Sequence, residues 1–117
     1  MTESDRGIFE RVRGILGDEI LLNAIVYVSH ETVHAGMQIH LGDALVEVPW
    51  EARVVFVDLE PKANWGHRCA YIILQLGDDG GFIRKDAQMP PFLKPGGMPF
   101  RLLWKGAEVP EWTVATL

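Results

Sequence analysis

Most of the chain after Gly17 consists of short runs of β-branched and aromatic residues that are separated by turn residues. The run from Ala52 to Leu59 is almost continuously apolar, as expected of a strand that is covered on both faces. A second strong run extends from His67 to Leu76, and residues 77–81, which are glycine and aspartate, follow it as a turn. Turn signals roughly every eight to twelve residues are typical of an antiparallel sandwich or a partly open barrel. The sequence therefore predicts a mainly β fold.

Apolar and polar residues alternate from Thr32 to Leu41, which predicts a half-buried strand. Residues 29–31 would then form the turn of a hairpin with the strand before it. The other predicted strands span residues 20–29, 44–48, 82–84, 100–104 and 112–117.

The first segment predicts one amphipathic helix over residues 4–16. Ser4 or Asp5 can cap it, because a short side-chain oxygen accepts the free N–H groups of the first turn. Apolar residues then recur at helical spacing, which gives the helix one face to bury. These residues are Ile8, Phe9, Val12, Ile15 and Leu16.

Length and composition predict a single domain, 1–117, with the helix followed by a β domain over residues 20–117. The formal net charge is −5 and the basic residues are scattered, so neither nucleic acid nor a membrane is an expected partner. The longest apolar stretch, Ile20–Val28, is interrupted by Asn23 and is too short to span a bilayer. Met1–Arg6 starts acidic and leads into no apolar region, so a signal peptide is not expected. One cysteine, Cys69, fits a reducing compartment, and we expect a cytoplasmic location.

One motif carries a catalytic hypothesis. The segment His30-Glu31-Thr32-Val33-His34 fits the H-E-x-x-H pattern of zinc metalloproteases, in which two histidines bind zinc and the glutamate acts as the general base. His40 lies where the longer metzincin pattern places a third zinc ligand. The alternative function is therefore a zinc-dependent hydrolase with Glu31 as its catalytic residue.

Geometry weighs against that hypothesis. The motif works on a helix, where residues four apart lie about 6 Å from each other. On a strand, His30 and His34 would be roughly 13 Å apart, too far to share a zinc ion with ligand bonds of about 2.1 Å. Because the alternation favours a strand, we expect no metal site and no cofactor here, with zinc as the alternative.

A second candidate pairs His67 with Cys69, which share a face if both lie on a strand. A protonated histidine can lower the pKa of a neighbouring thiol and make it nucleophilic. The alternatives are a thiol buried as a small apolar group, or a mixed metal site that also includes His34 or His40. Asp58 and Glu60 alternate near a strand end, which predicts a solvated edge.

The Pro-rich segment 89–100 predicts an extended loop, because prolines remove backbone donors from a sheet. Its apolar side chains either close one end of the sheet or form a contact surface for another protein. The favoured function is a non-catalytic binding or assembly module that acts through contact with a protein partner or a second copy. The predicted contact residues are Phe92, Leu93, Met98, Phe100, Trp104 and Trp112.

Overall fold

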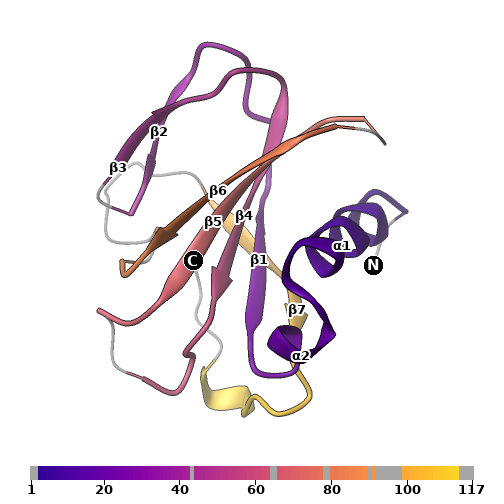
Figure 1. Ribbon diagram of the computed structural model, residues 1–117, viewed down its shortest axis with the longest axis vertical. Helices are drawn as coiled ribbons and strands as arrows, with labels where there is room; N and C mark the ends of the chain where they lie inside the picture. Colours follow the sequence, from indigo (N-terminus) through magenta and orange to yellow (C-terminus); the bar gives the residue numbers. More distant parts are fainter. Residues whose placement is uncertain are drawn as a thin grey trace.

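A five-stranded antiparallel sheet forms the centre of the computed structural model, which describes residues 3–42, 44–63, 66–77, 80–89, 91 and 99–113. A smaller sheet of two strands lies over one end of it (Figure 1). The large sheet is not closed into a barrel. The mainly β class and the N-terminal helix are therefore confirmed. The large sheet has the order β6 (Phe82–Ala87), β5 (Cys69–Gln75), β4 (Ala52–Asp58), β1 (Ile25–Ser29) and β7 (Phe100–Lys105), and the small one contains β2 (Gln38–Leu41) and β3 (Ala44–Glu47).

Strand β4 is covered on both faces, as its apolar sequence predicts. Side chains alternate along a strand, so Val54 and Phe56 point to one face of the sheet and Val55 and Val57 to the other. All four side chains are fully buried. Two hydrophobic clusters therefore form, one on each face of the large sheet.

Helix α1 (Glu3–Leu16) covers one face of the large sheet. Its buried residue Val12 packs among side chains of β1, β4 and β5. The Asp5 carboxylate, in the first turn, pairs with the guanidinium of Arg101 on β7, with Nη1 2.6 Å from Oδ2. This ion pair joins the start of the helix to an edge strand. The helix therefore has both apolar and charged contacts with the sheet.

Arg11, also on α1, contacts residues at the end of β5 and just before β6. Its guanidinium donates to the carbonyl oxygens of Gln75 at 2.6 Å, Gly80 at 3.0 Å and Gly81 at 3.1 Å. We expect Arg11→Met to lower the free energy of unfolding by about 1–3 kcal/mol, because carbonyl groups lose charge-assisted hydrogen bonds. Urea unfolding measures this, with Arg6→Met as the control because Arg6 lies exposed on the same helix. Equal losses of unfolding free energy in Arg11→Met and Arg6→Met would contradict a stabilising role for the Arg11 hydrogen bonds.

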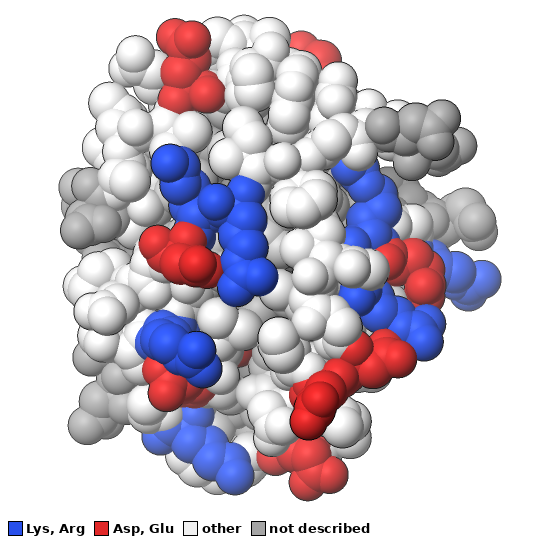
Figure 2. Space-filling view, in the orientation of Figure 1, with Lys and Arg blue, Asp and Glu red and all other residues white. Residues whose placement is uncertain are grey.

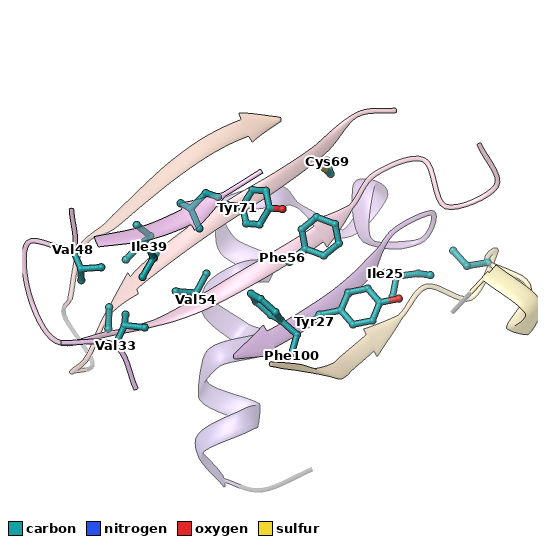
Figure 3. Packing of buried hydrophobic residues seen from close by; sticks show 14 residues of the cluster. Ile25, Tyr27, Val33, Ile39, Val48, Val54, Phe56, Cys69, Tyr71 and Phe100 are labelled. Carbon is teal, nitrogen blue, oxygen red and sulfur yellow. The ribbon is translucent and has the colours of Figure 1, made fainter. Parts of the chain in front are cut away.

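The other face of the large sheet is covered by residues 33–42 and 44–48, which include the small sheet. Val33, Ile39 and Val48 pack onto Val54 and the aromatic side chains of the large sheet (Figure 3). This second cluster is rich in rings, and Phe56 lies at its centre: its ring centroid is 5.0 Å from that of Tyr71 and 5.8 Å from that of Tyr27.

The predicted strand over residues 32–41 is wrong in its first half. The chain makes one bridge at Val33, turns at Ala35 and Gly36, and becomes a strand only at Gln38. Gly36 has a φ of 88°, which glycine adopts without the steric cost that other residues carry. A turn therefore interrupts a sequence that alternates as a strand does.

The segment before β1 also differs from the prediction of one strand over residues 20–29. Gly17 has a φ of 91° and ends α1, and a short helix α2 (Asp18–Leu21) follows before β1 begins at Ile25. The predicted hairpin around residues 29–31 does not form either, because β1 pairs with β4 and β7. Sheet neighbours distant in sequence replace the expected local pairing.

The last third of the described chain holds a longer β6 than the predicted residues 82–84. Trp112 lies in a short 3-10 helix, η2 (Glu111–Thr113), where a strand over residues 112–117 was predicted. Of the predicted Pro-rich loop, residues 90 and 92–98 lie outside the described residues, as do residues 114–117. Within the described ranges, no helix has the length and apolar character needed to cross a membrane.

Candidate protein-contact groove

A β-bulge in β7 decides which face its aromatic residues occupy. Tyr27 of β1 lies opposite Leu102, but the preceding residue, Val26, lies opposite Trp104, so the register shifts by one at this point. Phe100 before the shift packs into the ring-rich core and is only 5% exposed. Trp104 after the shift packs on the face that carries α1. The assignment of Phe100 to the contact surface is corrected: it is a core residue.

Trp104 is held in place by two contacts. Its ring lies against Phe9 of α1, with 4.8 Å between the ring centroids, and its indole N–H donates to the carbonyl oxygen of Leu21 at 3.1 Å. The indole is partly buried and its N–H has a hydrogen-bond partner, so this bond fixes the ring orientation. Strand β7, α1 and α2 therefore meet around Trp104.

A groove with a volume of about 560 Å³ opens where these elements meet. Its floor is apolar, and Leu22, just after α2, remains 44% exposed at its side. The backbone N–H of Glu108 donates to the carbonyl of Leu22 at 3.0 Å, so a neighbouring segment fixes the position of this residue. The lining residues are Phe9, Leu21, Leu22 and Trp104, with Arg13, Asp18 and Glu19 at the rim.

Among the described residues, Trp112 is the other predicted contact residue that is not brought to this groove. Trp112 is 72% exposed on η2 and is absent from the groove lining. Phe92, Leu93 and Met98 lie outside the described residues. Of the residues that line the groove, only Trp104 was predicted as a contact residue, and Phe9 was predicted only as part of the apolar face of the N-terminal helix. Two pairs of adjacent large apolar residues, Ile8–Phe9 in α1 and Leu21–Leu22 at the end of α2, were the available signal.

The H-E-x-x-H motif does not form the helix that zinc coordination requires. His30 and Glu31 lie in a bend after β1, and His34 lies beside the turn at Gly36. The His34 Nδ1 atom is 2.6 Å from the carboxylate of Glu51, and both side chains are largely exposed. His40 is an exposed residue of β2. Within the described ranges, no three His, Cys, Asp or Glu side chains gather closely enough to hold a metal ion.

A buried aspartate–histidine pair lies at the end of β4 instead. Asp58 Oδ1 is 2.7 Å from His67 Nε2, and both side chains are 5% exposed. Burial raises the pKa of Asp58, and the hydrogen bond to His67 opposes that rise. The backbone N–H of Glu60 also donates to Asp58 at 3.1 Å. The predicted solvated edge at Asp58 is therefore wrong.

Cys69 lies beside Asp58 in the sheet but faces an environment that disfavours a thiolate. Its side chain is buried, its register partner on β4 is Asp58, and its Sγ is 3.5 Å from the carbonyl oxygen of Met89. Burial, with the negative charges of Asp58 and Asp86, raises the pKa of the Cys69 thiol to about 12. In this structure His67 forms a hydrogen bond with Asp58. The raised pKa of Cys69 disfavours the thiolate that a nucleophile needs.

We expect the native protein to resist a thiol reagent at pH 8. With a pKa of about 12, the thiolate fraction there is about 10⁻⁴, against roughly one quarter for an ordinary thiol. The absorbance released by a disulfide reagent should rise only when urea unfolds the chain. Rapid reaction of Cys69 in folded protein would instead support a reactive thiol.

Comparison of the chain with protein-family models, with curated proteins and with solved structures found no significant match. No family or relative therefore indicates what the groove or the buried pair does.

Proposed function

We propose that this chain is a non-catalytic protein-binding module and that the groove between α1, α2 and β7 receives apolar side chains of its partner. One observation carries the proposal: an apolar groove with a charged rim remains open beside an ordered tryptophan. Protein interfaces combine such a core of aromatic and aliphatic residues with a polar rim. The buried free Cys69 supports action in a reducing compartment such as the cytoplasm.

The rival function, a zinc-dependent hydrolase, requires His30 and His34 on one turn of a helix. Residues 30–34 contain a bend and a single β-bridge instead, and His34 faces Glu51. No observation therefore favours this second function over protein contact.

Titration with a model peptide tests the proposal. The probe is an uncharged peptide of leucine and glutamine with leucines at helical spacing, followed by NMR of labelled protein. We expect shifts concentrated in the groove, including the indole signal of Trp104. The variant Leu22→Ser should weaken binding about tenfold, because an exposed apolar anchor is lost.

The matched control is Leu45→Ser, the same change at an exposed leucine of β3 in the small sheet. It should leave the peptide affinity unchanged. If Leu22→Ser binds as well as the parent, or if both variants lose affinity equally, the groove is not the contact site.

A further inference from the structure

The rim of the groove carries more negative than positive charge. A second hollow of about 280 Å³ adjoins the groove: Arg13 and Asp18 line both, and Glu10 lines the second. Glu19 lines the groove itself. Among the described lining residues of the two hollows, three carry a carboxylate and one carries a guanidinium. Figure 2 shows acidic side chains over α2 and side chains of both signs over α1.

Arg13, the one basic residue among the described lining residues, is already paired. Arg13 Nε lies 2.5 Å from Asp18 Oδ1, and its Nη1 lies 3.4 Å from Glu10 Oε2. Glu19 has no hydrogen bond or ion pair within the described part of the chain, and it is exposed. The charge left for a partner is therefore negative, and it lies next to the apolar floor.

This charge favours a different protein over a second copy as the occupant. Two copies joined through the groove would bring two acidic rims together, and the whole chain carries a net charge of −5. Like charges across an interface are unfavourable, whereas opposite charges speed association and fix orientation. Self-association through this face is thus opposed.

We infer that the partner segment is an amphipathic helix whose apolar side chains enter the groove and whose lysine or arginine side chains meet Glu19, Glu10 and Asp18. The inference rests on the proposed function, since it names the chemistry of the partner for the same groove. Amphipathic helices commonly dock apolar residues into such grooves, and flanking charges select among them.

Three labelled peptides test this inference by fluorescence anisotropy. They share the same leucine positions and carry lysine, glutamine or glutamate elsewhere. We expect the lysine peptide to bind most tightly and the glutamate peptide most weakly. Glu19→Lys should weaken binding of the lysine peptide about threefold to tenfold and leave the affinity for the glutamine peptide unchanged, because charges at the rim contribute modestly to affinity.

The control for non-specific attraction is Glu47→Lys, an exposed glutamate of β3 that gives the same net charge. It should leave all three affinities as in the parent. If Glu47→Lys weakens binding of the lysine peptide as much as Glu19→Lys does, the peptide is attracted by the net charge of the protein and the inference is overturned.

The remaining outcomes separate the two proposals. If all three peptides bind equally and Leu22→Ser weakens each of them, the groove binds protein but the basic partner is wrong. If sedimentation shows self-association that Leu22→Ser abolishes, the occupant is a second copy, which also overturns the inference. If Leu22→Ser affects no peptide, the proposed function itself fails.

Discussion

Replacing Phe56 with alanine is expected to lower the free energy of unfolding by about 3–5 kcal/mol, because a fully buried ring leaves a cavity that the core fills only in part. The ring contacts Tyr27, Tyr71 and Phe100, which come from three other strands of the large sheet. A domain of this size has a total stability of about 5–15 kcal/mol, so this loss is a large share. Urea unfolding followed by circular dichroism measures it.

The matched control is Phe82→Ala on the edge strand β6, where the ring is 49% exposed. The same chemical change there should cost less than about 1 kcal/mol. If Phe56→Ala does not fold, Phe56→Leu keeps part of the volume and should cost about 1–2 kcal/mol. Equal losses for Phe56→Ala and Phe82→Ala would contradict the central position of Phe56.

Replacing His67 with alanine is expected to cost about 3 kcal/mol at neutral pH, because it leaves the Asp58 carboxylate buried without its hydrogen-bond partner. The pKa of Asp58 is already raised by burial, and loss of the histidine removes the hydrogen bond that opposes the rise. Thermal unfolding across a pH series measures the effect.

The direction of the pH dependence follows from the raised pKa of Asp58. Because the folded pKa of Asp58 lies above the unfolded value of 3.8, the folded state binds the proton more tightly. The stability of His67→Ala should therefore increase as the pH falls from neutral through the folded pKa toward 3.8. Adding Asp58→Asn should remove this pH dependence and recover stability at neutral pH.

His34→Ala is the matched control, since His34 also has a carboxylate partner, at 2.6 Å, but both side chains are largely exposed. Exposed pairs contribute about 0–1 kcal/mol, so this variant should keep nearly full stability. Similar losses for His34→Ala and His67→Ala would show that burial of the Asp58–His67 pair does not matter.

The spacing of apolar residues predicted the elements whose structure depends on residues near them in the sequence. The apolar run around Phe56 identified a strand covered on both faces, and helical spacing identified α1 almost to its bounds. The alternation from Thr32 was misleading, because Gly36 makes a turn without changing the apolar pattern. Ala35 and Met37, on the predicted apolar face, are exposed at this turn, so the alternation there did not mark buried side chains.

The candidate sites were harder to predict because they join distant residues. Trp104 bonds to Leu21, 83 positions away, and no local pattern predicts that β7 lies beside β1. The bulge in β7 then places Phe100 and Trp104 on opposite faces, although their even spacing predicts one face. Asp58 was mistaken for an exposed acid because its partner, His67, lies across a loop.

The most direct test of the protein-contact groove is the position of a bound peptide. Nuclear Overhauser effects would be recorded between leucine methyl groups of the lysine peptide and the labelled protein. We expect contacts to the rings of Phe9 and Trp104 and to the methyl groups of Leu22. Contacts confined to Trp112, or to Leu45 on the small sheet, would contradict the assignment of the groove as the contact site.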